Sequence, residues 1–103
     1  MPRAPRQAPF TDLFIHCGLL LALTGGFGMA AALAAQEAFD IRLARWWPVL
    51  VQVHGHTQIF GWLGLFIMGV SLYFLPRFAG VPLRSPAAAT LSAALLAVGI
   101  AGR

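Results

Sequence analysis

The chain has no lysine, only three acidic residues and a single cysteine among its 103 residues. All seven basic residues are arginines, and they stand singly or in pairs beside apolar runs. Nothing therefore resembles the dense basic patch of a nucleic-acid-binding protein, and no nucleic-acid partner is expected. Because Cys17 stands alone, a disulfide within the chain is excluded.

Charge is also missing from long stretches of the chain. Hydrophobic residues make up 59% of the sequence and charged residues only 10%. No Asp, Glu, Lys or Arg occurs between Arg45 and Arg77, a distance well beyond the roughly 20 apolar residues that cross a bilayer. A soluble core of this length could not bury so much apolar surface. The composition predicts an integral membrane protein in contact with the lipid bilayer.

Two apolar runs follow a short N-terminal tail, residues 1–12. The first run, 13–35, carries no charge and is long enough for one helix crossing. The second is predicted as a helix over 48–75, about 40 Å long, so it must tilt or project beyond the hydrocarbon. We expect Pro76 to end this helix and Gly80 to mark the loop that follows.

A third helix is predicted over 86–102, after an N-cap at Ser85 and a first-turn proline at Pro86. Its part rich in Ala and Leu, Ala87–Ala101, covers only about 22 Å, short of a hydrocarbon core of about 30 Å. The predicted fold is an all-α membrane protein, a helical bundle over 13–103 with two full transmembrane helices and a truncated third. We expect an N-terminal fragment of a polytopic protein, with other transmembrane helices or subunits as partners.

Small residues recur every four positions along the first apolar run, at Gly18, Ala22, Gly26, Ala30 and Ala34. That spacing places them on one face of a helix, where the backbone of another helix can approach closely. The run is therefore predicted to pack against a neighbouring helix.

A cleaved signal peptide is the rival interpretation of the first apolar run. Arg3 and Arg6 would supply its basic region, and Ala32-Leu33-Ala34 matches an A-x-A cleavage site. Against cleavage, the apolar stretch is long for the core of a signal peptide, and the small-residue face continues up to the site.

The positions of the arginines predict the orientation of the chain in the membrane. The tail and the loop after Pro76 carry more of them than the loop between the first two helices: Arg3, Arg6, Arg77 and Arg84 against Arg42 and Arg45. Positive residues favour the cytoplasmic side of a membrane. The chain is thus predicted to be a multi-pass protein of the inner (plasma) membrane, with its N-terminus in the cytoplasm.

Three polar side chains stand at membrane depth in the long uncharged run: His54, His56 and Gln58. Imidazoles are costly there, which makes them candidates for function. Helical positions two apart point about 200° from each other, so His54 and His56 cannot both bind one metal from a regular helix. Gly61 shares the face of His54, where a small residue would leave room for a planar macrocycle beside an axial imidazole.

The histidines allow other interpretations. They could be buried and hydrogen-bonded to a neighbouring helix, or act as a proton relay. His16 does not complete a site, because it is predicted to lie roughly 24 Å from His54 across the membrane. A second axial ligand for a haem at His54 would come from His56 of another copy, from an external ligand, or from helices outside this chain.

Residues 54–62, HGHTQIFGW, followed by Gly69, Tyr73 and the LPR of residues 75–77, resemble the second transmembrane helix of haem–copper oxidase subunit I proteins. They are equally similar to the H-x-H-x-x-x-F-G segment of the NnrS family. Members of that family are multi-helix membrane proteins that carry haem and copper and are linked to nitric oxide metabolism. The chain departs from the NnrS pattern at Thr57, where that family usually has an acidic residue.

The resemblance implies haem binding, with haem b as the expected cofactor and copper as a further one. His54 would be the axial ligand and His56 a weaker candidate for haem or metal, with Gln58, Gly61 and Tyr73 near the cofactor. The implied function is nitric oxide or respiratory electron chemistry. The chain is not expected to be an enzyme alone, but a part of an oxidoreductase, because an oxidase needs further ligands on later helices.

The alternative of a different class is a small helical membrane component without a cofactor. Its histidines would join helices by hydrogen bonds.

Overall fold

A computed structural model describes residues 9–103, and every regular element in that range is helical. The first long helix consists of α1 (Pro9–Leu21), a π-helical segment η1 (Ala22–Gly28) and α2 (Met29–Ala38). It begins four residues earlier than predicted, because Pro9 is tolerated in a first turn and Asp12 complements the positive helix end. The rest of the predicted tail, residues 1–8, lies outside the described residues.

The second long helix consists of α3 (Trp46–His56), a π-helical segment η2 (Thr57–Leu63) and α4 (Gly64–Ala79). It is followed by the shorter α5 (Pro86–Ala101). The predicted start of α5 is confirmed, because the Ser85 hydroxyl accepts a hydrogen bond from the Ala88 N–H at 3.2 Å and Pro86 occupies the first turn.

The second helix does not end at Pro76, and our expectation there was wrong. The helix continues to Ala79 and ends at Gly80, which has a left-handed φ of 67°. The Gly80 N–H bonds to the Arg77 carbonyl, and the Val81 N–H bonds to the Pro76 carbonyl at 3.0 Å. The missing N–H of Pro76 removes a single backbone bond, which helices in membranes tolerate.

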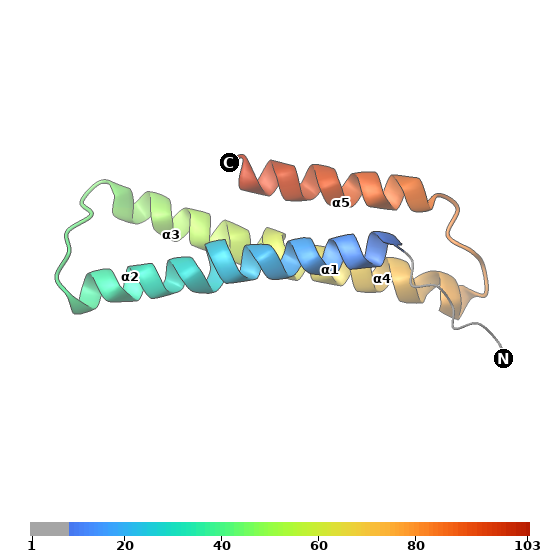
Figure 1. Cartoon of the computed structure of the whole chain (residues 1–103), viewed down its shortest axis with the longest axis horizontal. Helices are drawn as coiled ribbons and strands as arrows, with labels where there is room; N and C mark the ends of the chain where they lie inside the picture. The colour runs from blue at the N-terminus through green and yellow to red at the C-terminus, as the bar shows by residue number, and fades with distance from the viewer. Residues whose placement is uncertain (1–8) are drawn as a thin grey trace.

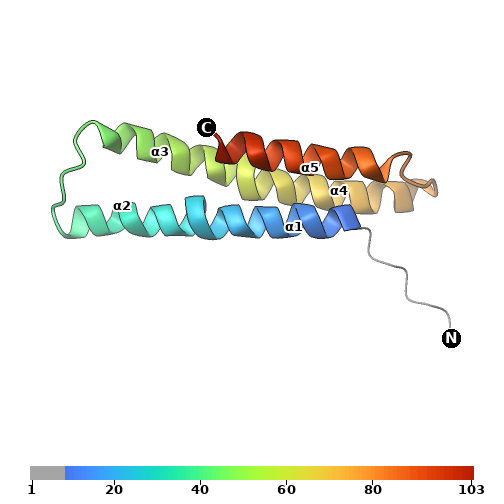
Figure 2. The same ribbon diagram turned by 45° about the horizontal axis from the view of Figure 1, so that its top comes forward.

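The two long helices run antiparallel, and α5 packs on the end of the pair that contains α1 and α4 (Figure 1). The main contact of α5 is with α1, and Figure 2 shows the C-terminus partway along the bundle. The molecule is elongated, with principal extents of 60 × 27 × 18 Å. Within residues 9–103, two helices are long and apolar enough to cross a membrane, Phe10–Ala38 and Trp46–Ala79.

The core is small and lies where α1, α4 and α5 meet. Phe14 and Leu65 are fully buried, and Ala89 and Ala93 complete the contact from α5. Many large apolar side chains point outward instead, such as Phe78, which is 81% exposed. An apolar exterior of this kind suits lipid contact, because hydrocarbon chains do not penalise it.

The predicted small-residue face is confirmed over its first half. Gly18, Ala22 and Gly26 are buried, and a Cβ on Gly18 would lie 3.4 Å from the carbonyl oxygen of Trp62. Farther along, Ala30 is partly exposed and Ala34 is exposed. The small-residue face therefore packs against the second long helix as far as η1. Beyond η1 its residues are partly or fully exposed.

Candidate functional site

The two π-helical segments, η1 and η2, pack against each other in the middle of the long helices. In such a segment a backbone N–H bonds to the carbonyl five residues back instead of four. Single widened turns of this type are rare and are often found at functional sites. The contact between η1 and η2 is therefore a candidate functional site.

The widened turn in η1 changes the bonding of one carbonyl group. In a regular α-helix the Met29 N–H would bond to the carbonyl of Gly25. Here it bonds to the carbonyls of Thr24 and Gly26 instead. Gly28 helps to shape this turn, because a Cβ there would lie 2.9 Å from the carbonyl oxygen of Leu23. The Gly25 carbonyl thereby loses its regular donor within the helix.

His54 supplies a replacement donor from the other long helix. Its Nδ1 lies 3.1 Å from the Gly25 carbonyl oxygen, in a partly buried position. Since a carbonyl oxygen only accepts hydrogen bonds, Nδ1 must carry the proton. In the neutral ring, Nε2 then keeps its lone pair and can bind a metal or accept a proton. The hydrogen bond thus sets both the orientation and the tautomer of the imidazole.

Thr57 and Gln58, next in the chain, pack directly over glycines of η1. A Cβ on Gly25 would lie 2.5 Å from Thr57 Cγ2, and one on Gly26 would lie 3.3 Å from Gln58 Nε2. The Gln58 Oε1 also accepts a hydrogen bond from the indole N–H of Trp62. Gln58, predicted to lie beside a cofactor, is thus placed at the contact between the helices.

Gly61 is also placed at this contact. It is buried, and a Cβ there would lie 3.3 Å from Thr57 Cγ2 and 3.5 Å from Leu21 Cβ. The space that the sequence predicts beside Gly61 is therefore filled by the first helix. Open space lies instead at Gly55, next to His54, where a Cβ would meet no atom within 4 Å.

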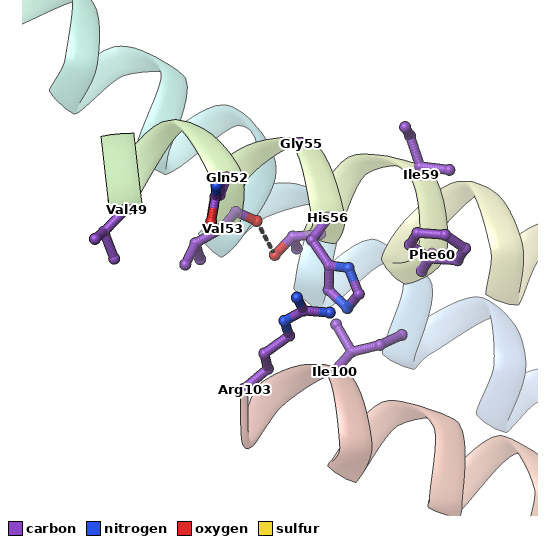
Figure 3. Close-up of a pocket in the computed structure, with 10 residues that line it drawn as sticks. Val49, Gln52, Val53, Gly55, His56, Ile59, Phe60, Ile100 and Arg103 are labelled. Carbon is purple, nitrogen blue, oxygen red and sulfur yellow. Dashed lines mark hydrogen bonds between the residues drawn. The ribbon is translucent and has the colours of Figure 1, made fainter. Parts of the chain in front are cut away.

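His56 faces another part of the molecule. Its ring is tilted by 45° against Phe60, with the ring centroids 4.9 Å apart. It lines a cavity of about 490 Å³, where Figure 3 shows it pointing toward Ile100 and Arg103 at the end of the third helix. His54 does not line this cavity. The two histidines therefore contact different parts of the molecule, as their spacing on a helix predicts.

The remaining polar groups singled out in the sequence lie elsewhere. The Nδ1 of exposed His16 lies 2.6 Å from the Asp12 carbonyl oxygen of its own helix. Tyr73 lies under the guanidinium of Arg77, 3.5 Å from the ring centroid. It is about 28 Å from His54 along the same helical rod, so the structure does not bring the two together. Among residues 9–103, no group of three or more His, Cys, Asp or Glu side chains could hold a metal ion.

Sequence reasoning missed two contributors to this region. The Gly25 carbonyl is a backbone group, and its only signal was the run of glycines at 25, 26 and 28, which favours an irregular turn. The sequence did not indicate a role for Arg103, because its proximity to the cavity beside His56 depends on how α5 packs. Comparison of the chain with protein-family models, curated proteins and solved structures found no match in any of the three.

Proposed function

We propose that this chain is part of an integral membrane protein of the NnrS or haem–copper oxidase subunit I-like type, and that it binds haem b through His54. The observation that carries the proposal is the bond from His54 Nδ1 to the Gly25 carbonyl oxygen. Histidines that ligate metals almost always donate their other ring N–H to a carbonyl, a carboxylate or water. That bond fixes the ring and makes Nε2 a better ligand.

The tautomer of His54 is compatible with a haem. A neutral imidazole with a free Nε2 is the usual axial donor for haem iron. Gln58 and Gly61 have a different role in this proposal, since they hold the two long helices together and thereby keep His54 in place.

The membrane location follows from the apolar helices and the arginine distribution. With the N-terminus in the cytoplasm of a cell whose inner membrane holds the chain, His54 lies in the half of the bilayer away from the cytoplasm. A bound haem would supply redox chemistry or diatomic gas binding there, in nitric oxide or respiratory electron metabolism. Its second axial ligand, and the ligands of any copper ion, would come from outside the described residues.

A second candidate function is favoured by the same hydrogen bond. The pair of His54 and Gly25 joins the two long helices at membrane depth, which a cofactor-free helical component would also need. In that case the imidazole is a structural donor, and Nε2 binds nothing. The two candidates differ in whether the protein carries a chromophore.

Optical spectroscopy of the full-length protein in detergent tests the proposal. We expect a Soret band that His54→Ala abolishes and that His56→Ala only shifts. His16→Ala is the matched control, because that exposed histidine bonds only within its own helix. Added imidazole should restore the band in His54→Ala by occupying the vacated position, which separates loss of the ligand from loss of the fold.

Two results would reject haem binding through His54. One is a protein that stays colourless after reconstitution with haem, and the other is a Soret band that survives His54→Ala unchanged. A colourless protein in which His54→Gln preserves helicity and association would support the cofactor-free candidate instead.

A further inference from the structure

The cavity beside His56 has a polar end and apolar walls. It lies between the second long helix and the end of α5, and its volume of about 490 Å³ falls in the range of small-molecule sites. Figure 3 shows the guanidinium of Arg103 reaching toward the imidazole of His56. Ile59, Phe60 and Ile100 supply apolar wall. Mostly apolar hollows with a few convergent polar groups are the usual form of a ligand site.

The side chains that line this cavity bring positive charge and no negative charge. Among the described residues that line it, none is Asp or Glu, while Arg103 contributes a permanent positive charge. His56 adds an imidazole that can donate a hydrogen bond. A cation near the hydrocarbon is costly unless an anion accompanies it. The cavity therefore favours a ligand with a negatively charged group.

The direction of the cavity matches that of a lipid molecule. His56 lies about 15 Å along the helix from Trp46, where the second helix emerges from its loop. Phe60 lies one turn deeper than His56, and Ile100 precedes Arg103 by about one turn of α5. Gln52 and Arg103 thus lie nearer to the head-group region than Phe60 and Ile100 do, and Val49 and Val53 add apolar wall at the same end as Gln52.

We propose that this cavity binds an anionic phospholipid of the surrounding bilayer. Its phosphate contacts Arg103 and His56, and an acyl chain runs along Ile59, Phe60 and Ile100. Arginine suits this role because its planar guanidinium forms paired hydrogen bonds to phosphate oxygens. The site is separate from the one proposed at His54, since His54 does not line the cavity.

Native mass spectrometry of the full, haem-free protein in detergent tests this inference. Phosphatidylglycerol, phosphatidylcholine with the same acyl chains, and oleate are titrated separately. We expect one retained phosphatidylglycerol, with phosphatidylcholine bound about tenfold more weakly, because its choline cation offsets the phosphate charge and would be repelled by Arg103. Arg103→Gln should weaken phosphatidylglycerol binding by a similar factor, and Arg103→Lys should restore part of it.

Further variants separate this site from general effects of charge and from the His54 site. Arg84→Gln removes an arginine that does not line the cavity, so it should leave binding unchanged. Ile100→Trp should weaken binding by filling the cavity without changing charge. His54→Ala should have no effect on lipid binding, whatever it does to haem.

Three outcomes would overturn the inference. Equal binding of the two phospholipids would show that the charge is not recognised. Equal weakening by Arg84→Gln and Arg103→Gln would show that the cavity is not the site. Oleate bound as tightly as phosphatidylglycerol would identify a carboxylate amphiphile as the ligand in place of a phospholipid.

Discussion

Phe14 of the first helix occupies the space left by the absent side chain of Gly69 on the second. A Cβ on Gly69 would lie only 2.6 Å from the Phe14 Cβ, and Phe14 itself is fully buried. The atom that would clash sits next to the backbone, so it cannot move aside without shifting a whole helix. This contact therefore fixes the distance between α1 and α4.

Gly69→Ala is accordingly expected to destabilise the protein by about 1–3 kcal/mol through overpacking. Thermal unfolding in detergent measures the effect. Gly99→Ala is the matched control, because no atom lies within 4 Å of a Cβ placed on Gly99. The control should be neutral or stabilising by up to about 1 kcal/mol, as alanine favours helix more than glycine does. Equal effects of the two substitutions would contradict the proposed fit of Phe14.

The contact of Thr57 with Gly25 leads to a second prediction. Gly25→Ala should destabilise by about 1–3 kcal/mol, because the new methyl group would overlap Thr57 Cγ2. Adding Thr57→Ser should recover part of the loss, since it removes Cγ2 but keeps the hydroxyl that donates to the Val53 carbonyl. Gly55→Ala, at an open position, is the control. Failure of the double variant to recover any stability would rule out the Cγ2 methyl group as the cause, since Thr57 Oγ1 at 2.9 Å remains in the serine variant.

The hydrogen bond of His54 predicts its tautomer. In haem-free protein at neutral pH, nitrogen NMR of labelled histidines should show His54 with a proton on Nδ1 and none on Nε2. His16 provides an internal comparison, because its Nδ1 lies beside a carbonyl oxygen of its own helix and is exposed. A proton found on Nε2 of His54 would contradict the bond to Gly25 and remove the support for an axial ligand.

The end of the second helix gives a fourth prediction. Gly80→Ala should destabilise by about 1 kcal/mol, because alanine is strained at the left-handed φ of 67°. Pro76→Ala should be neutral or stabilising by up to about 3 kcal/mol, since it restores a backbone donor inside an existing helix. Thermal unfolding of both variants checks this. A loss of stability in Pro76→Ala together with none in Gly80→Ala would mean that the proline ends the helix after all.

The elements of the fold could largely be predicted from the sequence, because they follow from apolar length and from local signals. The N-cap at Ser85 and the packing face through Gly18, Ala22 and Gly26 depend only on neighbouring residues and on helical spacing. The opposite directions of His54 and His56 also follow from the helical period. These predictions were confirmed by the structure.

The details of the candidate site could not be predicted, because they depend on contacts between helices. The widened turns η1 and η2 have no clear sequence period of their own, so the role of the Gly25 carbonyl stayed hidden. The space beside a glycine is open or filled according to the residues of the facing helix. Leu21 fills the space at Gly61, and no atom fills the space at Gly55. The haem, the copper and the family resemblance remain predictions.

The widened turn in η1 withdraws the Met29 N–H from a main-chain oxygen, that of Gly25, within a helix that continues from Pro9 to Ala38. Hydrocarbon offers no water to solvate such an oxygen, and the imidazole of the facing helix supplies a donor to it. One hydrogen bond thus joins the imidazole of His54 to the widened turn of the opposite helix. Any event that pulls this ring away would leave the Gly25 carbonyl without its donor from the facing helix, 29 residues distant in the chain but adjacent in space.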